Sequence, residues 1–152
     1  MTILHPTSET GAVSISTEMT AVPSFHLRDE DEGKPLADAG LNATFIADTL
    51  SAMAAHERCV RHLYKSVAGR THNPMLKAKY QDFGAEAEEH VRILSELMSA
   101  FGIDPQYVSP LARIAEKAGS GLVESTYLLS GSCDLITQEM VMLEAVMLAD
   151  VK

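Results

Sequence analysis

Two long runs with one helical spacing, separated by a single turn, constrain the fold of this chain more than any other feature. In both runs the positions of one face alternate by four and three residues, which is the spacing of a buried helical stripe. The first stripe comprises Ile46, Leu50, Met53, Glu57, Val60, Tyr64 and Val67, and the second comprises Leu76, Tyr80, Phe83, Ala87, His90, Leu94, Leu97 and Phe101. The spacing therefore predicts one helix over about 41–67 and another over about 74–101.

The residues at the ends of these runs support the same boundaries. Asn42 or Asp38 can cap the first helix, and Asn73 followed by Pro74 is a typical start for the second. Gly102 is suited to the left-handed position after a helix. Since the loop between the helices is short, we expect an antiparallel hairpin whose arms are each roughly 40 Å long at 1.5 Å per residue.

The remainder of the chain predicts a connection and a third long helix. Pro and Gly boundaries indicate a crossover over 103–121 with a short helix at 110–118, and the third helix is expected to start near Leu122. From Leu128 onward this helix is apolar nearly all round, interrupted by Glu139 and Glu144, of which we expect Glu144 to face inward. Three helices with so apolar a third lack one packing partner, so we expect either a longer chain or a second chain to cover it.

Bulk composition predicts a single domain and excludes several classes of function. The segment 1–37 is rich in Ser, Thr, Gly and Pro without helical or alternating periodicity, so we interpret it as a flexible tail preceding a helical domain over 38–152. A net charge of −9 argues against a nucleic-acid surface. No stretch of 18 apolar residues without a charge is present, so no membrane span is expected. Cys59 and Cys133 form no metal or redox spacing, and we predict a cytoplasmic protein.

Three polar residues lie on or beside the two buried stripes at matching heights. Counted from the shared turn, Glu57 is about 16 residues back, and Glu86 and His90 are 13 to 17 residues forward. An unpaired carboxylate or imidazole is costly to bury, so metal coordination is one explanation. The alternatives are partial exposure, a pair between Glu57 and Arg61, or pairs of Glu86 and His90 with Arg92 or Lys79.

The chain resembles the ferritin-like superfamily, and most of all its YciE/YciF-type and rubrerythrin-like branches. The resemblance covers about 41–150 and rests on the segments 55–64, AHERCVRHLY, and 86–94, EAEEHVRIL, followed by FGIDP at 101–105. It implies an all-α, up-down helical bundle with a carboxylate-bridged di-iron or di-manganese centre. The implied metal ligands are Glu57, Glu86 or Glu89, His90 and Glu144.

This sequence departs from that pattern in two places. The spacing from Glu86 to His90 is four residues, and position 87, where a spacing of three would place the carboxylate, is Ala. The fourth helix, with a second Glu-x-x-His, is not recognisable in the sequence, so one chain supplies half of a dinuclear site.

Two functions follow from this reading. The first is a metal protein that handles iron, oxygen or peroxide in stress protection, with no catalytic residue assigned. The second is a non-catalytic helical interaction module, for which we expect a homodimer or a partner chain over the third helix.

Overall fold

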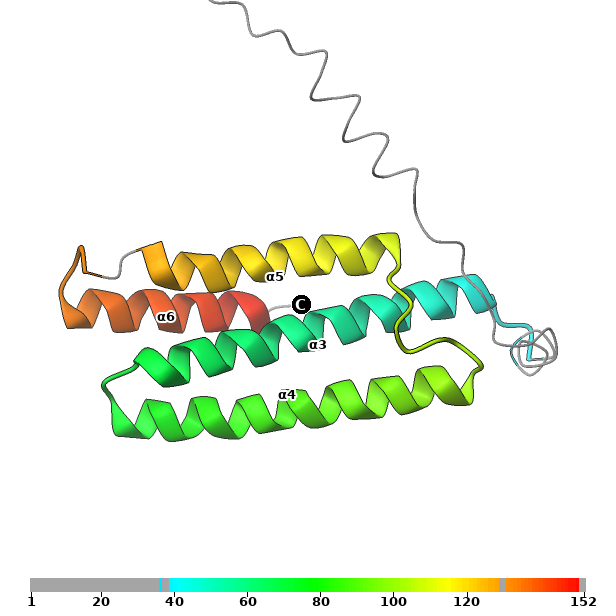
Figure 1. Ribbon diagram of the computed structural model, residues 1–152, viewed down its shortest axis with the longest axis horizontal. Helices are drawn as coiled ribbons and strands as arrows, with labels where there is room; N and C mark the ends of the chain where they lie inside the picture. Colours follow the sequence, from blue (N-terminus) through cyan, green and yellow to red (C-terminus); the bar gives the residue numbers. More distant parts are fainter. Residues whose placement is uncertain (1–35, 37–38, 129–130, 151–152) are drawn as a thin grey trace, which may run out of the picture.

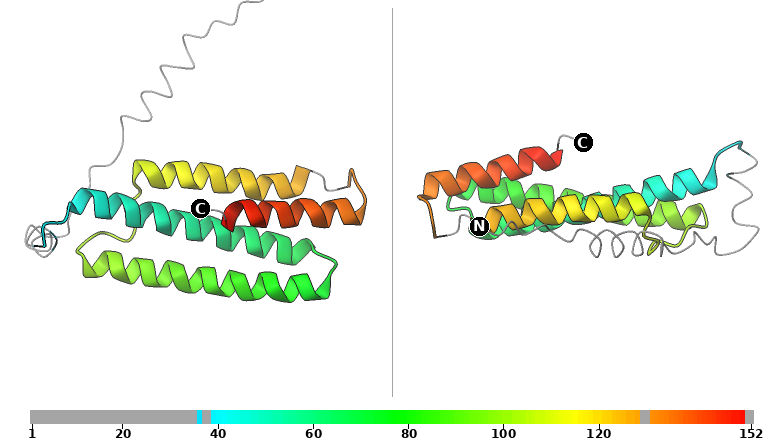
Figure 2. Two further views of the ribbon diagram at one scale, coloured as in Figure 1. Left: turned by 180° about the vertical axis from the view of Figure 1, so that it is seen from behind. Right: turned by 90° about the horizontal axis from the view of Figure 1, so that it is seen from above.

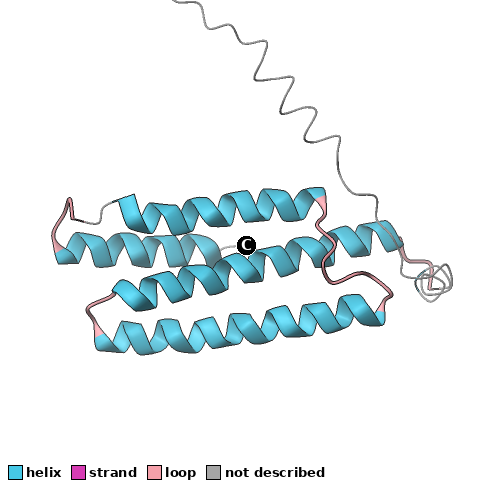
Figure 3. Ribbon diagram, viewed as in Figure 1, coloured by secondary structure: helices cyan, strands magenta, loops and turns pink. Residues whose placement is uncertain are grey.

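The computed structural model describes residues 36, 39–128 and 131–150. This part of the chain contains four α-helices and no strand: α3 (Ala43–Arg70), α4 (Pro74–Ala100), α5 (Pro110–Leu128) and α6 (Leu135–Asp150). All four helices are shown in Figure 1, and Figure 3 separates them from the short connections. The prediction of an all-α bundle is therefore confirmed at the level of secondary structure and helix packing.

The predicted hairpin is present with its expected caps. Asn42 Oδ1 accepts a hydrogen bond from Phe45 N at 3.0 Å, and Asn73 Oδ1 accepts one from Met75 N at 2.9 Å. Pro74 occupies the start of α4, and Gly102 follows it with a positive φ of 72°. Local sequence thus fixes both helices of the hairpin, since each cap satisfies backbone donors that the first turn leaves unpaired.

The expected short helix at 110–118 and third helix from Leu122 are wrong. One continuous helix, α5, runs from Pro110 through Gly119 and Gly121 to Leu128. Gly119 marks a close approach between helices instead of a break, because a Cβ at this position would lie 2.4 Å from Cβ of Cys59 on α3. Gly119 therefore allows α5 to pack tightly against α3. The described part of the chain contains a fourth long helix, α6, but this helix has no Glu-x-x-His.

The real turn comes later, between α5 and α6. Gly131 has a positive φ of 80°, and Asp134 caps α6 by accepting hydrogen bonds from Thr137 N at 3.0 Å and Thr137 Oγ1 at 2.9 Å. A glycine in the left-handed region followed by an Asp cap is a sufficient local signal for a helix start. The two helices together form a second antiparallel pair (Figure 1).

The helices are arranged around α3. It lies between α4 and α5 and packs along both, while α6 lies against α5 and α3 on one face of this group (Figures 1 and 2). The largest core cluster joins α3, α4 and α6 at the end of the hairpin turn, through Val60, Leu63, Tyr64, Val67, Ala68, Tyr80, Ala87, Met142, Ala145, Val146 and Ala149. The described residues of α6, Leu135–Asp150, lie along part of the length of α3.

The predicted flexible tail lies almost wholly outside the described residues. Of the segment 1–37, the structure describes Leu36, which is buried and whose carbonyl accepts a hydrogen bond from Leu41 N at 2.9 Å. No helix in the described ranges has the length and apolarity needed to cross a membrane.

Candidate functional site

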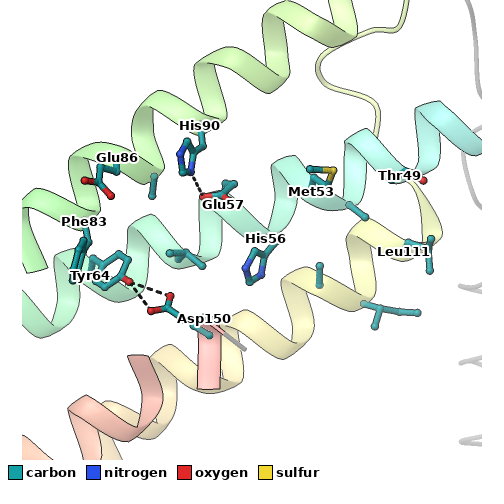
Figure 4. A pocket seen from close by; sticks show the side chains of 16 residues that line it. Thr49, Met53, His56, Glu57, Tyr64, Phe83, Glu86, His90, Leu111 and Asp150 are labelled. Carbon is teal, nitrogen blue, oxygen red and sulfur yellow. Dashed lines mark hydrogen bonds and ion pairs between the residues drawn. The ribbon is translucent and has the colours of Figure 1, made fainter. Parts of the chain in front are cut away.

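A wide groove lies beyond the end of α6, between α4 and α5. Its volume is about 840 Å³. Its floor is α3, its two walls are α4 and α5, and Ala149 and Asp150 of α6 close one end (Figure 4). The residues that line it are Thr49, Ala52, Met53, His56, Glu57, Val60, Tyr64, Phe83, Glu86, Ala87, His90, Leu111, Ile114, Ala115, Ala149 and Asp150. The groove thus combines apolar walls with carboxylates and imidazoles from three helices.

Glu57 and His90 meet across the hairpin inside this groove. Nδ1 of His90 on α4 lies 3.3 Å from Oε2 of Glu57 on α3, as Figure 4 shows. The Glu57 side chain is 23% exposed, and the His90 side chain is 55% exposed. The predicted match in height between the two helices is confirmed, and Glu86, one turn before His90, lines the same groove.

Arg61, Arg92 and Lys79, which were alternative partners for these residues, form ion pairs with other acids. Arg61 Nη1 bonds to Glu88 Oε2 at 2.7 Å, so the alternative of a pair between Glu57 and Arg61 is wrong. Arg92 pairs with its neighbours Glu89 and Glu96 on α4. Lys79 lies 3.9 Å from Asp82 on the same helix. Glu57 therefore has an imidazole as its partner, in a groove whose other acidic side chains are Glu86 and Asp150.

Tyr64 links the acidic end of the groove to α6. Its hydroxyl donates to Asp150 at 3.1 Å, and its ring packs against that of Phe83 with 5.5 Å between centroids (Figure 4). Burial and the adjacent Asp150 raise the pKa of the Tyr64 phenol well above its ordinary value, and Glu86 and Glu57 act in the same direction. The phenol is therefore close enough to all three carboxylates to respond to their charges.

Two of the predicted ligands lie elsewhere. Glu89 is exposed and bonds to Arg92, with 2.8 Å between Arg92 Nε and Glu89 Oε2. Glu144 is also exposed and does not line the groove, so the expectation that it faces inward is wrong. It is Glu139 that faces the bundle: it accepts hydrogen bonds from Thr71 Oγ1 at 2.8 Å and from His72 N at 2.6 Å. Because α6 is apolar nearly all round, the periodicity of the sequence could not decide whether Glu139 or Glu144 faces the bundle.

Asp150, Tyr64 and His56 were not singled out as site residues by the sequence. Asp150 lies four residues after Val146, but the alternating row of Glu139, Met142 and Val146 continues to Ala149, so that row would not have found Asp150. His56 lies on α3 next to Glu57 and also lines the groove (Figure 4). From the sequence alone, a single histidine at the edge of a helix does not indicate a site. His56 becomes a candidate only because the structure places it in the lining of the groove.

The side chains in the groove are of the types that bind divalent metal ions, but they are too far apart to hold an ion in the described structure. Carboxylate oxygens and an imidazole nitrogen are ligands for Fe(II), Mn(II) or Zn(II). Across the described ranges, however, no three His, Cys, Asp or Glu side chains are grouped closely enough to hold an ion as they stand. The residues do not fit the dinuclear centre, because Glu89 and Glu144 lie on other surfaces, and Glu57, Glu86 and His90 are the implied ligands that share the groove.

Comparison of the chain with known proteins gives no relative. No protein-family model, no curated protein and no solved structure matches it.

Proposed function

We propose that this chain is a metal-binding helical bundle of the ferritin-like kind, and that Glu57, His90 and Glu86 bind one divalent ion, iron or manganese, at the groove. The observation that carries this proposal is the contact of 3.3 Å between Glu57 and His90 at the middle of the hairpin, with Glu86 one turn away. The arginines and the lysine closest in sequence pair with other acids, so a cation is the complement that this acidic groove lacks.

The residues have distinct roles in this proposal. Glu57 and Glu86 supply carboxylate oxygens from two helices, and His90 supplies a ring nitrogen. Bound Fe(II) or Mn(II) would supply one-electron chemistry with oxygen or peroxide, the reaction expected of a cytoplasmic stress-protection protein. Asp150 accepts a hydrogen bond from the Tyr64 hydroxyl at the end of the groove. Its carboxylate also makes the electrostatic potential of the groove more negative.

The experiment is a titration of the protein with Mn(II), and with Fe(II) under anaerobic conditions, followed by calorimetry and electron paramagnetic resonance. We expect about one ion per chain, with affinity reduced at least about tenfold in His90→Ala and in Glu57→Gln. Glu89→Gln is the matched control, because Glu89 is next to His90 on α4 but bonds to Arg92 outside the groove. Absence of binding, or binding that His90→Ala leaves intact, would refute the proposal.

A second candidate function is favoured by the size of the groove. A volume of about 840 Å³ is far larger than one ion needs, and Met53, Leu111 and Ile114 give it an apolar lining with exposures of 49, 51 and 64%. We propose as the alternative that this chain is an interaction module whose groove binds an amphipathic helix of a partner chain. Lysine or arginine on that helix would complement Glu57, Glu86 and Asp150.

A designed peptide separates the two candidates. A helical probe of alternating Leu and Lys rows, labelled with a fluorophore, should bind the wild-type protein and lose affinity in Ile114→Glu if the groove docks helices. A matched probe with Glu in place of Lys is the control. Equal binding of both probes, or binding unaffected by Ile114→Glu, would exclude the docking function, and neither result depends on metal.

A further inference from the structure

A second groove lies between α3 and α5, which run side by side in the same direction (Figures 1 and 2). We call it the α3–α5 groove. It shares no lining residue with the acidic groove described above, and its volume is about 710 Å³. The residues that line it are Cys59, His62, Lys65, Ser66, Gly69 and Arg70 of α3 and Gly119, Ser120, Val123, Glu124 and Tyr127 of α5. A groove of this volume is in the range of sites that bind small molecules.

The α3 wall of this groove has small residues between two long cationic side chains. Each residue of a helix is turned about 100° from the one before it, so Lys65 and Arg70 leave the helix roughly 140° apart. Ser66 and Gly69 fall between them in direction. A Cβ added to Gly69 would meet nothing within 4 Å, so the space beside it is open. The two cations therefore flank an open floor.

The guanidinium of Arg70 is held at the groove by α5. Its central carbon lies 4.3 Å from the centroid of the Tyr127 ring, and its Nη1 donates a hydrogen bond to Thr126 Oγ1 at 2.9 Å. A ring and a hydroxyl orient a guanidinium without neutralising its charge. Arg70 is therefore positioned in advance for an anion in the groove.

Two further donors of the groove lack an acceptor. The Tyr127 hydroxyl accepts a hydrogen bond from Ser66 Oγ at 2.9 Å, and its own proton has no acceptor among the described residues. Lys65 is exposed and forms no ion pair with any acid in the described ranges. The imidazole of His62, one turn before Ser66, lines the groove as well. The groove thus offers hydrogen-bond donors to a ligand that carries acceptors.

The charges of the lining leave a local positive excess in an acidic chain. Glu124 is the one acid of the lining, and it is exposed and forms no ion pair with a described residue. Lys65 and Arg70 together outweigh it by one charge. The next charged residues along the two helices are Arg58 and Glu116, which pair with each other at 3.7 Å and so cancel. In a chain whose net charge is −9, this excess is opposite in sign to the whole.

We propose that the α3–α5 groove binds the phosphate group of a small phosphate ester. Lys65 and Arg70 contact the phosphate oxygens as cations, and the Tyr127 hydroxyl donates to one of them. A phosphate monoester carries close to two negative charges and three acceptor oxygens, which match two cations and a hydroxyl donor better than one carboxylate does. The volume of the groove exceeds that of a phosphate ion and leaves room for the organic part of an ester. This site does not depend on the metal ion proposed at Glu57.

The test is a titration of the ¹⁵N-labelled full chain with phenyl phosphate, followed by nuclear magnetic resonance. The titration is made at about pH 8, where the phosphate is a dianion, and at fixed ionic strength. We expect saturable shifts of the amide signals of Gly69, Gly119 and Ser120, which line the groove. Phenol is the uncharged counterpart and should cause no saturable shift of these signals.

Inorganic phosphate identifies the source of the phosphate group. Tighter binding of phenyl phosphate than of inorganic phosphate supports an ester as the ligand. Equal affinity of the two also supports the phosphate site, and it assigns free phosphate as the source. No saturable shift with either probe would overturn the proposal.

Charge variants test which residues hold the phosphate. Lys65→Gln should weaken binding of phenyl phosphate at least about fivefold, and Glu124→Gln should strengthen it, because the acid repels the anion. Lys77→Gln is the matched control, since Lys77 is an exposed lysine of α4 outside the groove. Equal weakening in Lys65→Gln and Lys77→Gln would mean that only the net charge of the protein matters, and would refute the site.

A steric variant tests the groove itself without a change of charge. Gly69→Leu fills the open floor and should abolish binding. Gly121→Leu is its matched control, because a Cβ at Gly121 also meets nothing within 4 Å but this residue does not line the groove. Circular dichroism should show unchanged helicity in both variants, because neither site is crowded. Binding that persists in Gly69→Leu and in Lys65→Gln would place the phosphate elsewhere and overturn the inference.

Discussion

Individual side chains in this bundle are mostly satisfied locally, and Tyr80 is the exception. Its side chain is 2% exposed, it packs 6.3 Å from the ring of Tyr64, and its hydroxyl has no hydrogen-bond partner among the described residues. Burial raises the pKa of this phenol, and the charge of Glu139 raises it further. A buried hydroxyl without a hydrogen-bond partner lowers the stability of the fold, whereas the buried aromatic ring contributes to it.

We therefore predict that Tyr80→Phe stabilises the protein. Removing the hydroxyl keeps the ring in the core and eliminates a desolvation cost of roughly 1–2 kcal/mol. Denaturant unfolding followed by circular dichroism measures the change. The matched control is Tyr64→Phe, which removes a hydroxyl that donates to Asp150 and should instead destabilise by about 1 kcal/mol. A loss of stability in Tyr80→Phe would mean that its hydroxyl has a partner.

At the scale of whole helices, the close packing of α5 against α3 depends on one glycine. Gly119 has no room for a side chain, since an added Cβ would lie 2.4 Å from Cβ and 2.6 Å from Sγ of Cys59. Gly121 is two residues further along the same helix and has nothing within 4 Å of its added Cβ. The two glycines are alike in sequence, so only packing distinguishes them.

We predict opposite effects of alanine at these two positions. Gly119→Ala forces α5 away from α3 and should destabilise by about 1–3 kcal/mol. Gly121→Ala places a better helix former in open space and should stabilise by about 0.5–1 kcal/mol. Thermal unfolding of both variants beside the wild-type protein checks the pair. Equal effects at both sites would show that the close approach of α3 and α5 is not as described.

The same glycines explain how much of the fold sequence reasoning recovers. The hairpin was predictable because Asn42, Asn73 and Gly102 act through bonds to their own neighbours, and the apolar spacing is regular. The boundary between α5 and α6 was missed because the role of Gly119 depends on Cys59, sixty residues earlier, whereas Gly131 and Asp134 carry the local signal. A glycine can end a helix or allow two helices to pack closely, and the sequence alone does not distinguish these two roles.

The candidate site was predictable to a similar extent. Glu57, Glu86 and His90 were found because a hairpin with a short turn fixes the height of every residue on both arms. Glu144 was misplaced and Asp150 was missed because α6 is apolar on most sides, so its inward row had no polar side as a contrast. The metal itself stays a prediction, as do the partner and the cytoplasmic location.

In the molecule as a whole, tyrosines join the separate helices. The Tyr64 hydroxyl on α3 donates to Asp150 at the end of α6, and the hydroxyl of Tyr107, in the connection before α5, donates to Asp48 on α3 at 2.6 Å. Tyr80 on α4 lies in the core shared with α6. Burial and the bond to Asp48 raise the pKa of Tyr107 to about 12, and burial raises the pKa of Tyr64 and Tyr80 as well.

These shifts predict how stability depends on alkaline pH. Each phenol has a higher pKa in the folded state than the ordinary value of 10.0, so the folded state binds protons more tightly. The resulting stabilisation is complete below pH 10 and is lost as the pH rises through 10 toward 12 and beyond. We expect the free energy of unfolding to fall over this range, as measured by denaturant titration at each pH.

Tyr107→Phe tests whether the phenols cause this fall. The variant should be less stable than the wild-type protein near neutral pH, because Asp48 loses a donor, yet its stability should decline less between pH 10 and 12. Ultraviolet absorbance of tyrosinate in the native wild-type protein should rise later than in the urea-unfolded chain. If the two proteins decline in parallel, ionisation of Tyr107 is not coupled to folding, and the bond to Asp48 contributes equally at every pH.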